Sequence, residues 1–571
     1  MSPRTSTRVL GAAAGAVVVL ALTGGALAIG GATHPPEGTS GAARTVQLPA
    51  GDVTEVCAPG PVPTTESTGP ADPDADLGDE TVRANSLMLT WPADDDAGPA
   101  ARASFTAGAG AEEPTPLAAG SDGEASSLSV GLSSPGVLTI DPVGDSVGTG
   151  GGAVVARTDA GDLRGLAAAT CVAPGAATWL VGGSTELGST ARLTLTNPGP
   201  VPVSVDATVH TELGVQDAPA LTDVVVPPRS SVDLPVEASV QAASLALRIQ
   251  SDGGQVAASL QDLRTQGLTS DGIDIVSPGA GPAPEQTIAG VEIADGAASA
   301  VRLVNPSDEV VTAAIDLATA DGWTALSGAE DVVLDPGVAL DVPLTGIEPG
   351  VHGFRVRASD PVAAAAFAAH AGTSEEGTGD VATEISWTPA TLAAASAEYV
   401  IPGAELGLDT TLALTNPTAS DQVVELTDLD GALTLDPVTV PAGGTAAVPL
   451  PDGVRAVRAV AEPADAAGAG GESPSGESPS GESPSAESPS GESPTAVQDM
   501  WSTEAPSDET PSGGAGTEDT ATADEPESEA STSGVVGVVL LGADAPTGRL
   551  VATLTAVPDA RLAGQVSVRL D

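Results

Sequence analysis

The sequence contains no lysine, so all 19 of its basic residues are arginines. Acidic residues number 77, which gives a formal net charge of −58. Nucleic acids and anionic lipid surfaces both attract basic segments, and a nucleic-acid-binding protein must displace counterions from the phosphates. The composition therefore argues against both kinds of partner.

Residues that carry chemistry are equally scarce. Aromatic residues make up 2% of the chain, so a sugar site would have few rings on which to stack, although carboxylate pairs for glycoside hydrolysis could form. The four histidines lie at positions 34, 210, 352 and 370 with no metal-ligand spacing, and two cysteines cannot make a zinc site. The Asp72–Asp76 run begins like a calcium loop, but Leu77 and Arg83 stand where glycine and glutamate are needed. We expect no enzyme activity, no cofactor and no metal.

A short motif recurs instead. Leu193-Thr194-Leu195-Thr196-Asn197-Pro198 returns as the segments that end in Asn305-Pro306 and Asn416-Pro417, and a weaker copy ends in Trp91-Pro92. The whole chain has four asparagines, and three of them are in these pairs. The Trp or Asn of the copies lies at residues 91, 197, 305 and 416, and such a nearly constant spacing identifies the folding unit.

The motif describes a strand that runs into a turn. Alternate leucines share the buried face of a strand, and proline cannot continue the hydrogen-bond ladder. The asparagine side chain can bond the backbone of the loop that follows. We interpret the three pairs as structural turns, and the alternative is a ligand contact. The residues concerned are Asn197, Pro198, Asn305, Pro306, Asn416 and Pro417.

A second signature follows each motif and consists of a strand, a Pro/Gly-rich turn and another strand. It runs over residues 224–236, 332–344 and 438–450, and each copy ends on a Val-Pro or Leu-Pro pair suited to an edge strand. Units of about 110 residues with many short strands are typical of immunoglobulin-like sandwiches. The sequence thus predicts an all-β chain of tandem immunoglobulin-like β-sandwich units, which we picture as a string. Trp91, Trp179, Trp323 and Trp387 are expected in core or strand-end packing, and Trp501 lies elsewhere.

The predicted domains follow from these repeats. Residues 1–34 form a signal-anchor or transmembrane segment, and the β units occupy 45–175, 176–275, 285–375 and 395–571. The last unit is interrupted by an insert, residues 463–533, which is acidic and rich in Ser and Pro. Such a sequence cannot offset its ordering entropy, so we predict a disordered loop. We place it at a hairpin tip, with Val535–Leu541 as the returning strand.

The N-terminal segment indicates export. Arg4 and Arg8 precede 23 uncharged residues, Val9 to Gly31, enough to span a bilayer as a helix. Ala26-Leu27-Ala28 also fits a signal-peptidase site, so a cleaved signal remains the alternative. The chain has two cysteines, Cys57 and Cys171, and an even number of cysteines in an exported protein suggests a disulfide. We therefore predict that these two are bonded to each other.

Cys171, the Trp179-Leu180-Val181-Gly182-Gly183 stretch and the Leu193–Pro198 motif together resemble a family of exported actinobacterial proteins of unknown function. The resemblance covers nearly everything after the N-terminal segment and implies a cell-envelope protein, with no catalytic residues to carry over. We expect a membrane-anchored scaffold whose bulk is extracellular. The alternative is a secreted module that binds a cell-wall glycan or another envelope protein.

The anchor leads to a first prediction. The mature protein should fractionate with membranes and retain the residues before His34, because a run of 23 uncharged residues exceeds the usual ~7–15 residues of a signal core. N-terminal sequencing of the purified protein measures this directly. A sequence that starts just after Ala28 would show the cleaved-signal alternative to be right.

Overall fold

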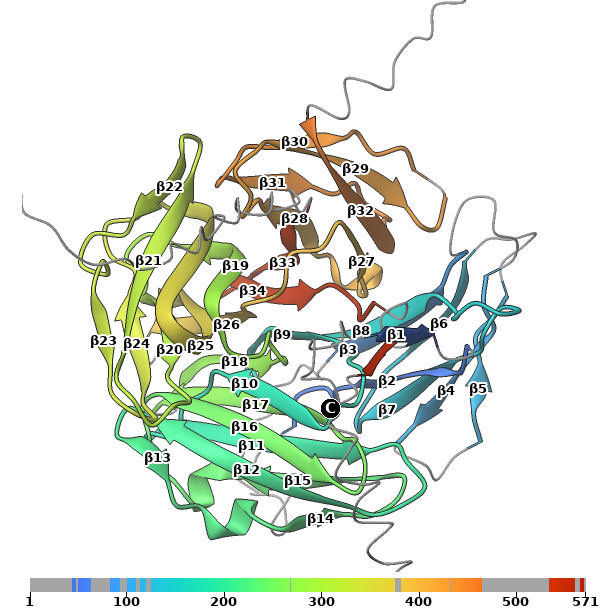
Figure 1. Ribbon diagram of the computed structural model, residues 1–571, viewed down its shortest axis with the longest axis horizontal. Helices are drawn as coiled ribbons and strands as arrows, with labels where there is room; N and C mark the ends of the chain where they lie inside the picture. Colours follow the sequence, from blue (N-terminus) through green and yellow to red (C-terminus); the bar gives the residue numbers. More distant parts are fainter. Residues whose placement is uncertain are drawn as a thin grey trace, which may run out of the picture.

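The computed structural model describes residues 44–47, 50–62, 83–92, 100–108, 113–119, 125–267, 269–374, 381–431, 433–464, 534–559 and 565–568. The fold is all-β, as predicted: its paired strands are antiparallel, and the helices whose bounds are described are short 3-10 turns. Most strands belong to four successive two-sheet units (Figure 1).

The first unit packs two four-stranded sheets face to face. One sheet contains, in spatial order, β2 (Val53–Cys57), β7 (Gly136–Ile140), β4 (Ala103–Ala107) and β5 (Thr115–Pro116). The other contains β6 (Ser126–Val130), β3 (Arg83–Thr90), β8 (Gly150–Thr158) and β9 (Gly165–Thr170). Cys57 and Cys171 form the predicted disulfide, which links β2 to the residue that follows β9 and so joins the two sheets.

The second unit repeats this plan. One sheet contains β10 (Ala177–Val181), β16 (Leu245–Asp252), β12 (Val203–Thr211), β13 (Gly214–Gln216) and β14 (Val224–Val226). The other contains β15 (Ser230–Pro235), β11 (Ser189–Asn197), β17 (Ala257–Gln266) and β18 (Thr269–Val276). The 3-10 turn η2 (Pro219–Leu221) lies between β13 and β14 of the first sheet, and η3 (Val236–Ala238) connects β15 to β16 of the opposite sheet. Leu193 and Leu195 are fully buried, as the alternation of the motif requires.

In the third unit a single long strand, β25 (Gly350–Ser374), takes part in both sheets. Its first half pairs with β19 (Ala283–Ile293) and β21 (Val311–Thr319), to which β22 (Gly322–Ala325) and β23 (Val332–Leu334) add. Its second half pairs with β20 (Ser299–Val304) and β26 (Val381–Pro389), and β24 (Ala339–Pro343) lies beside β20. The unit therefore reaches residue 389, beyond the boundary of 375 drawn from the sequence, because its last strand follows the gap at 375–380.

The fourth unit completes the series. One sheet contains β27 (Ser396–Val400), β32 (Ala456–Pro463), β29 (Gln422–Asp428) and β30 (Val438–Val440). The other contains β31 (Thr445–Pro449), β28 (Asp409–Thr415), β33 (Val536–Ala545) and β34 (Gly548–Thr555), and η4 (Ala404–Leu406) precedes β28. Val535–Leu541 does supply a buried returning strand. The predicted hairpin is wrong, however, because β33 pairs with β28 in the sheet opposite β32.

The units close into a ring rather than forming the expected string. Figure 1 looks along the axis of this ring, with the four sandwiches arranged around it. The last strand of each unit lies at the centre, where β9, β18, β26 and β34 pack in a circle, each against the next. Each of these four is the edge strand of its own sheet, so four sheet edges meet at the axis.

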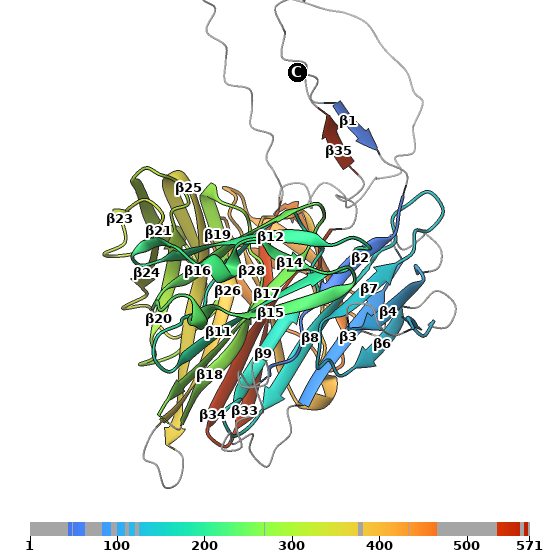
Figure 2. The same cartoon turned by 90° about the horizontal axis from the view of Figure 1, so that it is seen from below.

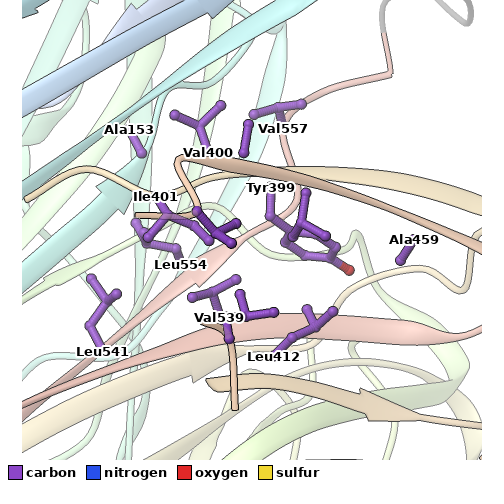
Figure 3. Packing of buried hydrophobic residues seen from close by; sticks show 14 of the residues in the cluster. Ala153, Tyr399, Val400, Ile401, Leu412, Ala459, Val539, Leu541, Leu554 and Val557 are labelled. Atoms are coloured by element: carbon purple, nitrogen blue, oxygen red, sulfur yellow. The ribbon is translucent and has the colours of Figure 1, made fainter. Parts of the chain in front are cut away.

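Ring closure depends on a hydrophobic core shared by the first and last units. Leu166 and Ala168 of β9 belong to the same buried cluster as Val539, Leu541 and Leu554. Figure 3 shows Ala153 from the first unit and Tyr399, Val400 and Ile401 from the fourth converging on this core. Residues far apart in the sequence thus share one apolar interior, and its burial favours the closed ring.

The described ends of the chain also meet. β1 (Arg44–Gln47) pairs with β35 (Gln565–Val568), and Figure 2 shows this two-stranded sheet standing off one side of the ring. The predicted anchor, His34, the two acidic loops near Asp72 and Asp94, Trp501 and most of the insert lie outside the described residues. Within the described ranges, no helix is both long and apolar enough to cross a membrane.

The position of β33 and β34 sharpens a prediction about the insert. Deleting residues 471–516 should leave the melting temperature almost unchanged, because shortening a flexible loop alters closure entropy by only about 0.6 kcal/mol per halving. Truncation after Ser533 should unfold the fourth unit, since it removes Val539, Leu541 and Leu554 from the core. Calorimetry on both variants tests this, and a truncated chain that melts like the intact one would contradict it.

Candidate functional site

The repeated asparagines act as side-chain clamps. Asn197 is fully buried at the end of β11, and its amide donates to the carbonyl oxygens of Val201 (2.7 Å) and Val226 (3.1 Å). Its own oxygen accepts from the backbone N–H of Gly199 at 2.9 Å. One side chain thereby holds the strand end, the turn after it and the end of β14, and so satisfies buried backbone groups.

The same clamp recurs in the next two units. Asn305 donates to Glu309 (2.7 Å) and Leu334 (3.1 Å), and it accepts from the backbone N–H of Ser307 (2.9 Å). Asn416 donates to Ser420 (2.8 Å) and Val440 (3.0 Å), and it accepts from Thr418 (2.9 Å). In all three units the second acceptor is the last residue of the short strand β14, β23 or β30. The two sequence signatures therefore meet at one point in each unit.

In the first unit Trp91 takes this place and is 2% exposed. Its backbone N–H donates to the carbonyl oxygen of Thr149 at 3.3 Å, and the hydroxyl of Thr149 donates back to the Trp91 carbonyl oxygen at 2.5 Å. Thr149 thus provides hydrogen-bond partners for the backbone N–H and C=O of Trp91, and the indole ring packs in the core.

The turns of the second signature contact the preceding unit. His210 of the second unit shares a hydrogen bond of 2.9 Å, through Nδ1, with the carbonyl oxygen of Gly337 in the third. Gly337 has a φ of +73°, and a Cβ there would lie 2.8 Å from the side chain of Val215. Only glycine suits both the left-handed backbone and this close approach.

Buried carboxylates join the units at the axis. Asp274 of β18 accepts the backbone N–H of Trp387 at 2.7 Å, and Glu384 of β26 accepts that of Leu166 at 2.8 Å. Both are about 1% exposed or less, and burial raises the pKa of each carboxyl well above its usual range. Arg164 approaches Glu384 at 3.5 Å. Asp274 thus bonds a backbone group of the neighbouring third unit, whereas Glu384 bonds one of the first unit, which lies across the axis.

A second polar cluster fixes the interface between the second and third units. Arg302, 2% exposed, pairs with Asp341 at 2.6 Å and donates to the carbonyl oxygens of Gly183 (2.6 Å) and Leu245 (2.8 Å). Its guanidinium lies 4.7 Å from the ring centroid of Trp387. Every contact named here is internal, which makes the cluster part of the interface between the two units.

One pocket has features of a binding site. It lies between the third and fourth units, has a volume of about 530 Å³, and is lined by Glu292, Asp295, His370, Asp409 and Arg549 among others. His370 is 5% exposed, yet its Nε2 has no hydrogen-bond partner. A buried polar atom without a partner costs free energy unless a ligand or water satisfies it.

Charges in the pocket are unbalanced. Arg549 pairs with Glu292 (3.2 Å) and more loosely with Asp409 (3.5 Å), so one guanidinium faces three carboxylates when Asp295 is included. Burial lowers the pKa of His370, although Glu292 acts in the opposite direction. The imidazole is therefore neutral near pH 7, although a contact with the backbone of Glu292 also raises its pKa. We assign the proton of the neutral imidazole to Nδ1, because Nε2 has no hydrogen-bond partner.

Sequence reasoning did not find this pocket. Its lining comes from strands of two units separated by up to 257 residues, the span of the Arg549–Glu292 pair, and no local motif marks them. The axial carboxylates did leave a signal, since Asp274 sits between Ile273 and Ile275 in a buried strand. Across the described ranges, no three His, Cys, Asp or Glu side chains are grouped so as to hold a metal.

The clamp leads to a prediction about stability. Asn305→Ala should lower stability by about 1–3 kcal/mol, because the carbonyl groups of Leu334 and Glu309 lose their donor inside the fold. Asp308→Ala, an exposed change in the same turn, is the control and should stay within about 0.5 kcal/mol. Urea unfolding of both variants measures the difference. Equal midpoints for the two would mean that the turn does not depend on the asparagine.

Comparison with known proteins agrees with the expectation of an uncharacterised family. Residues 118–451, which include the three clamps and both turn signatures, match a family described only as a family of unknown function, DUF5719. No curated protein matches the chain. The match spans more than half of the sequence and covers the second and third units with parts of the first and fourth, and the chain therefore belongs to the DUF5719 family.

Proposed function

We propose that this protein is a non-enzymatic scaffold of the cell envelope, exported and held at the membrane by its N-terminal segment. The closed ring is the observation that carries this proposal. Four units of immunoglobulin-like size, joined by buried polar clusters and a shared core, form a rigid body with several outward faces. Such a body suits the positioning of partners, and the disulfide favours an oxidising compartment outside the cytoplasm.

The chain ends support tethering from one side. Pairing of β1 with β35 brings the segment that follows the proposed anchor to the side of the ring shown in Figure 2. An anchor at residues 9–31 would then leave the four sandwich units free to face away from the membrane. Resemblance to exported actinobacterial proteins agrees with this orientation.

A wall-glycan-binding module remains the second candidate. Its support is the likeness of the turn signatures to those of bacterial surface modules, while the scarcity of aromatic side chains weighs against it. A saturable Kd for purified wall polysaccharide would favour the module. Specific co-purification of membrane proteins from envelope extracts would favour the scaffold.

The absence of lysine allows a direct test of topology. Leu392, between the third and fourth units, is 78% exposed, so Leu392→Lys adds one accessible amine to a chain with no other lysine. A membrane-impermeant amine reagent should label this variant in intact cells, and lysis should add only the labelling of Met1 that the unsubstituted protein also gains. The unsubstituted protein is the matched control, and in the anchored form its only amine, at Met1, stays inside. Labelling of the variant only after lysis would overturn the proposal, and labelling of the control in intact cells would indicate signal cleavage.

A further inference from the structure

We propose that the pocket between the third and fourth units binds a small organic cation with a primary ammonium group, which donates to Nε2 of His370 and lies among the carboxylates of Glu292, Asp295 and Asp409. This site is independent of the scaffold role. It also has nothing to do with the asparagine clamps, which lie at the other ends of the strands.

The first step is the unsatisfied acceptor. His370 lies near the end of β25, and only 5% of it is exposed. It lines the pocket, and its Nε2 has no hydrogen-bond partner. With the proton on Nδ1, this nitrogen can only accept a hydrogen bond. The ligand must therefore present an N–H or O–H donor at this position.

The second step is charge. Glu292, Asp295 and Asp409 outnumber Arg549, whose guanidinium is already paired with two of them. An anion would meet an excess of negative charge, so phosphate and carboxylate ligands are disfavoured despite the arginine. A cation gains from the same field, and the side chain of Asp409, 74% exposed, is free to turn toward it.

The third step selects among cations. The residues that line the pocket include no Phe, Tyr or Trp. Quaternary ammonium groups are recognised by aromatic cages, and neutral sugar rings commonly stack on aromatic faces, so both lack a platform here. No three metal-binding side chains of the described ranges are grouped suitably, which disfavours a metal ion. A primary ammonium needs only hydrogen-bond acceptors, and both the histidine and the carboxylates supply them.

Size is the fourth step. A volume of about 530 Å³ lies within the ~300–1,000 Å³ typical of small-molecule sites. One ammonium group would leave much of this space empty. A short chain with a donor at each end could reach from His370 at the base to Asp409 at the rim, and the aliphatic part would lie against Leu540 and Val351.

The test uses the full-length protein and 1,4-diaminobutane as the probe, measured by isothermal titration calorimetry at low salt. We expect saturable binding of the diamine and none of 1,4-butanediol, its neutral counterpart, or of tetramethylammonium. Failure of the diamine to saturate, or equal binding of the diol, would overturn the proposal, since charge would then play no part.

Two variants locate the site. His370→Phe keeps a planar ring but removes the acceptor, and it should weaken binding by about tenfold or more. Asp409→Asn changes an exposed side chain, so folding should be preserved, and binding should weaken by about fivefold. Thermal melts check that each variant is folded.

Asp308→Asn is the matched control. Asp308 is exposed and follows β20, whereas the pocket residue Asp295 precedes that strand, so the substitution removes the same charge at the opposite end of the unit. Its affinity should equal that of the wild type. Binding that falls equally in Asp308→Asn and Asp409→Asn would reflect net charge alone and would overturn the assignment to this pocket, whatever the folding of the His370 variant.

Discussion

The stability of the ring depends on burying four sheet edges together without leaving their backbone groups unpaired. An edge strand presents unpaired backbone N–H and C=O groups, which are costly when removed from water. β9, β18, β26 and β34 are such edges, and they meet at the axis without forming a common sheet. Asp274 and Glu384 resolve this problem because each carboxyl accepts a backbone N–H from another unit, Asp274 from the third and Glu384 from the first. A closed arrangement of sandwiches is stable only if these acceptors lie where the strands cannot pair.

Small side chains make that close approach possible. Gly272 of β18 has a φ of +102°, and a Cβ there would lie 2.6 Å from the backbone nitrogen of Ile385. Ala167 and Ala169 of β9 are buried against Ala58 and Ile275 in the same way. A chain poor in aromatic residues buries less apolar area per side chain, so it gains more from sharing surfaces between units. The low aromatic content of the sequence therefore makes contacts between units, such as those in the ring, more important for stability.

Short sequence patterns predicted the features that neighbouring residues determine, namely single strands and the turns that end them. The Leu-x-Leu alternation identified β11 and its repeats, the Asn-Pro pair identified the strand ends, and the paired cysteines identified the disulfide. The sheet to which a strand returns after a long insert is not determined locally, which is why the prediction that Val535–Leu541 closes a hairpin around the insert is wrong. Ring closure was missed for the same reason: apolar residues of β9 look like ordinary core residues, and nothing in their order shows that their partners lie in β34.

The pocket follows from the same geometry. At the interface of the second and third units, Arg302 fills the space and bonds both sides. Between the third and fourth units the arginine comes instead from β34, where Arg549 is 39% exposed and pairs with carboxylates at the rim. It therefore leaves the space beside His370 open. One interface is sealed by a buried cation that belongs to the chain, and the other keeps an acceptor and surplus carboxylates that a cation from outside can satisfy.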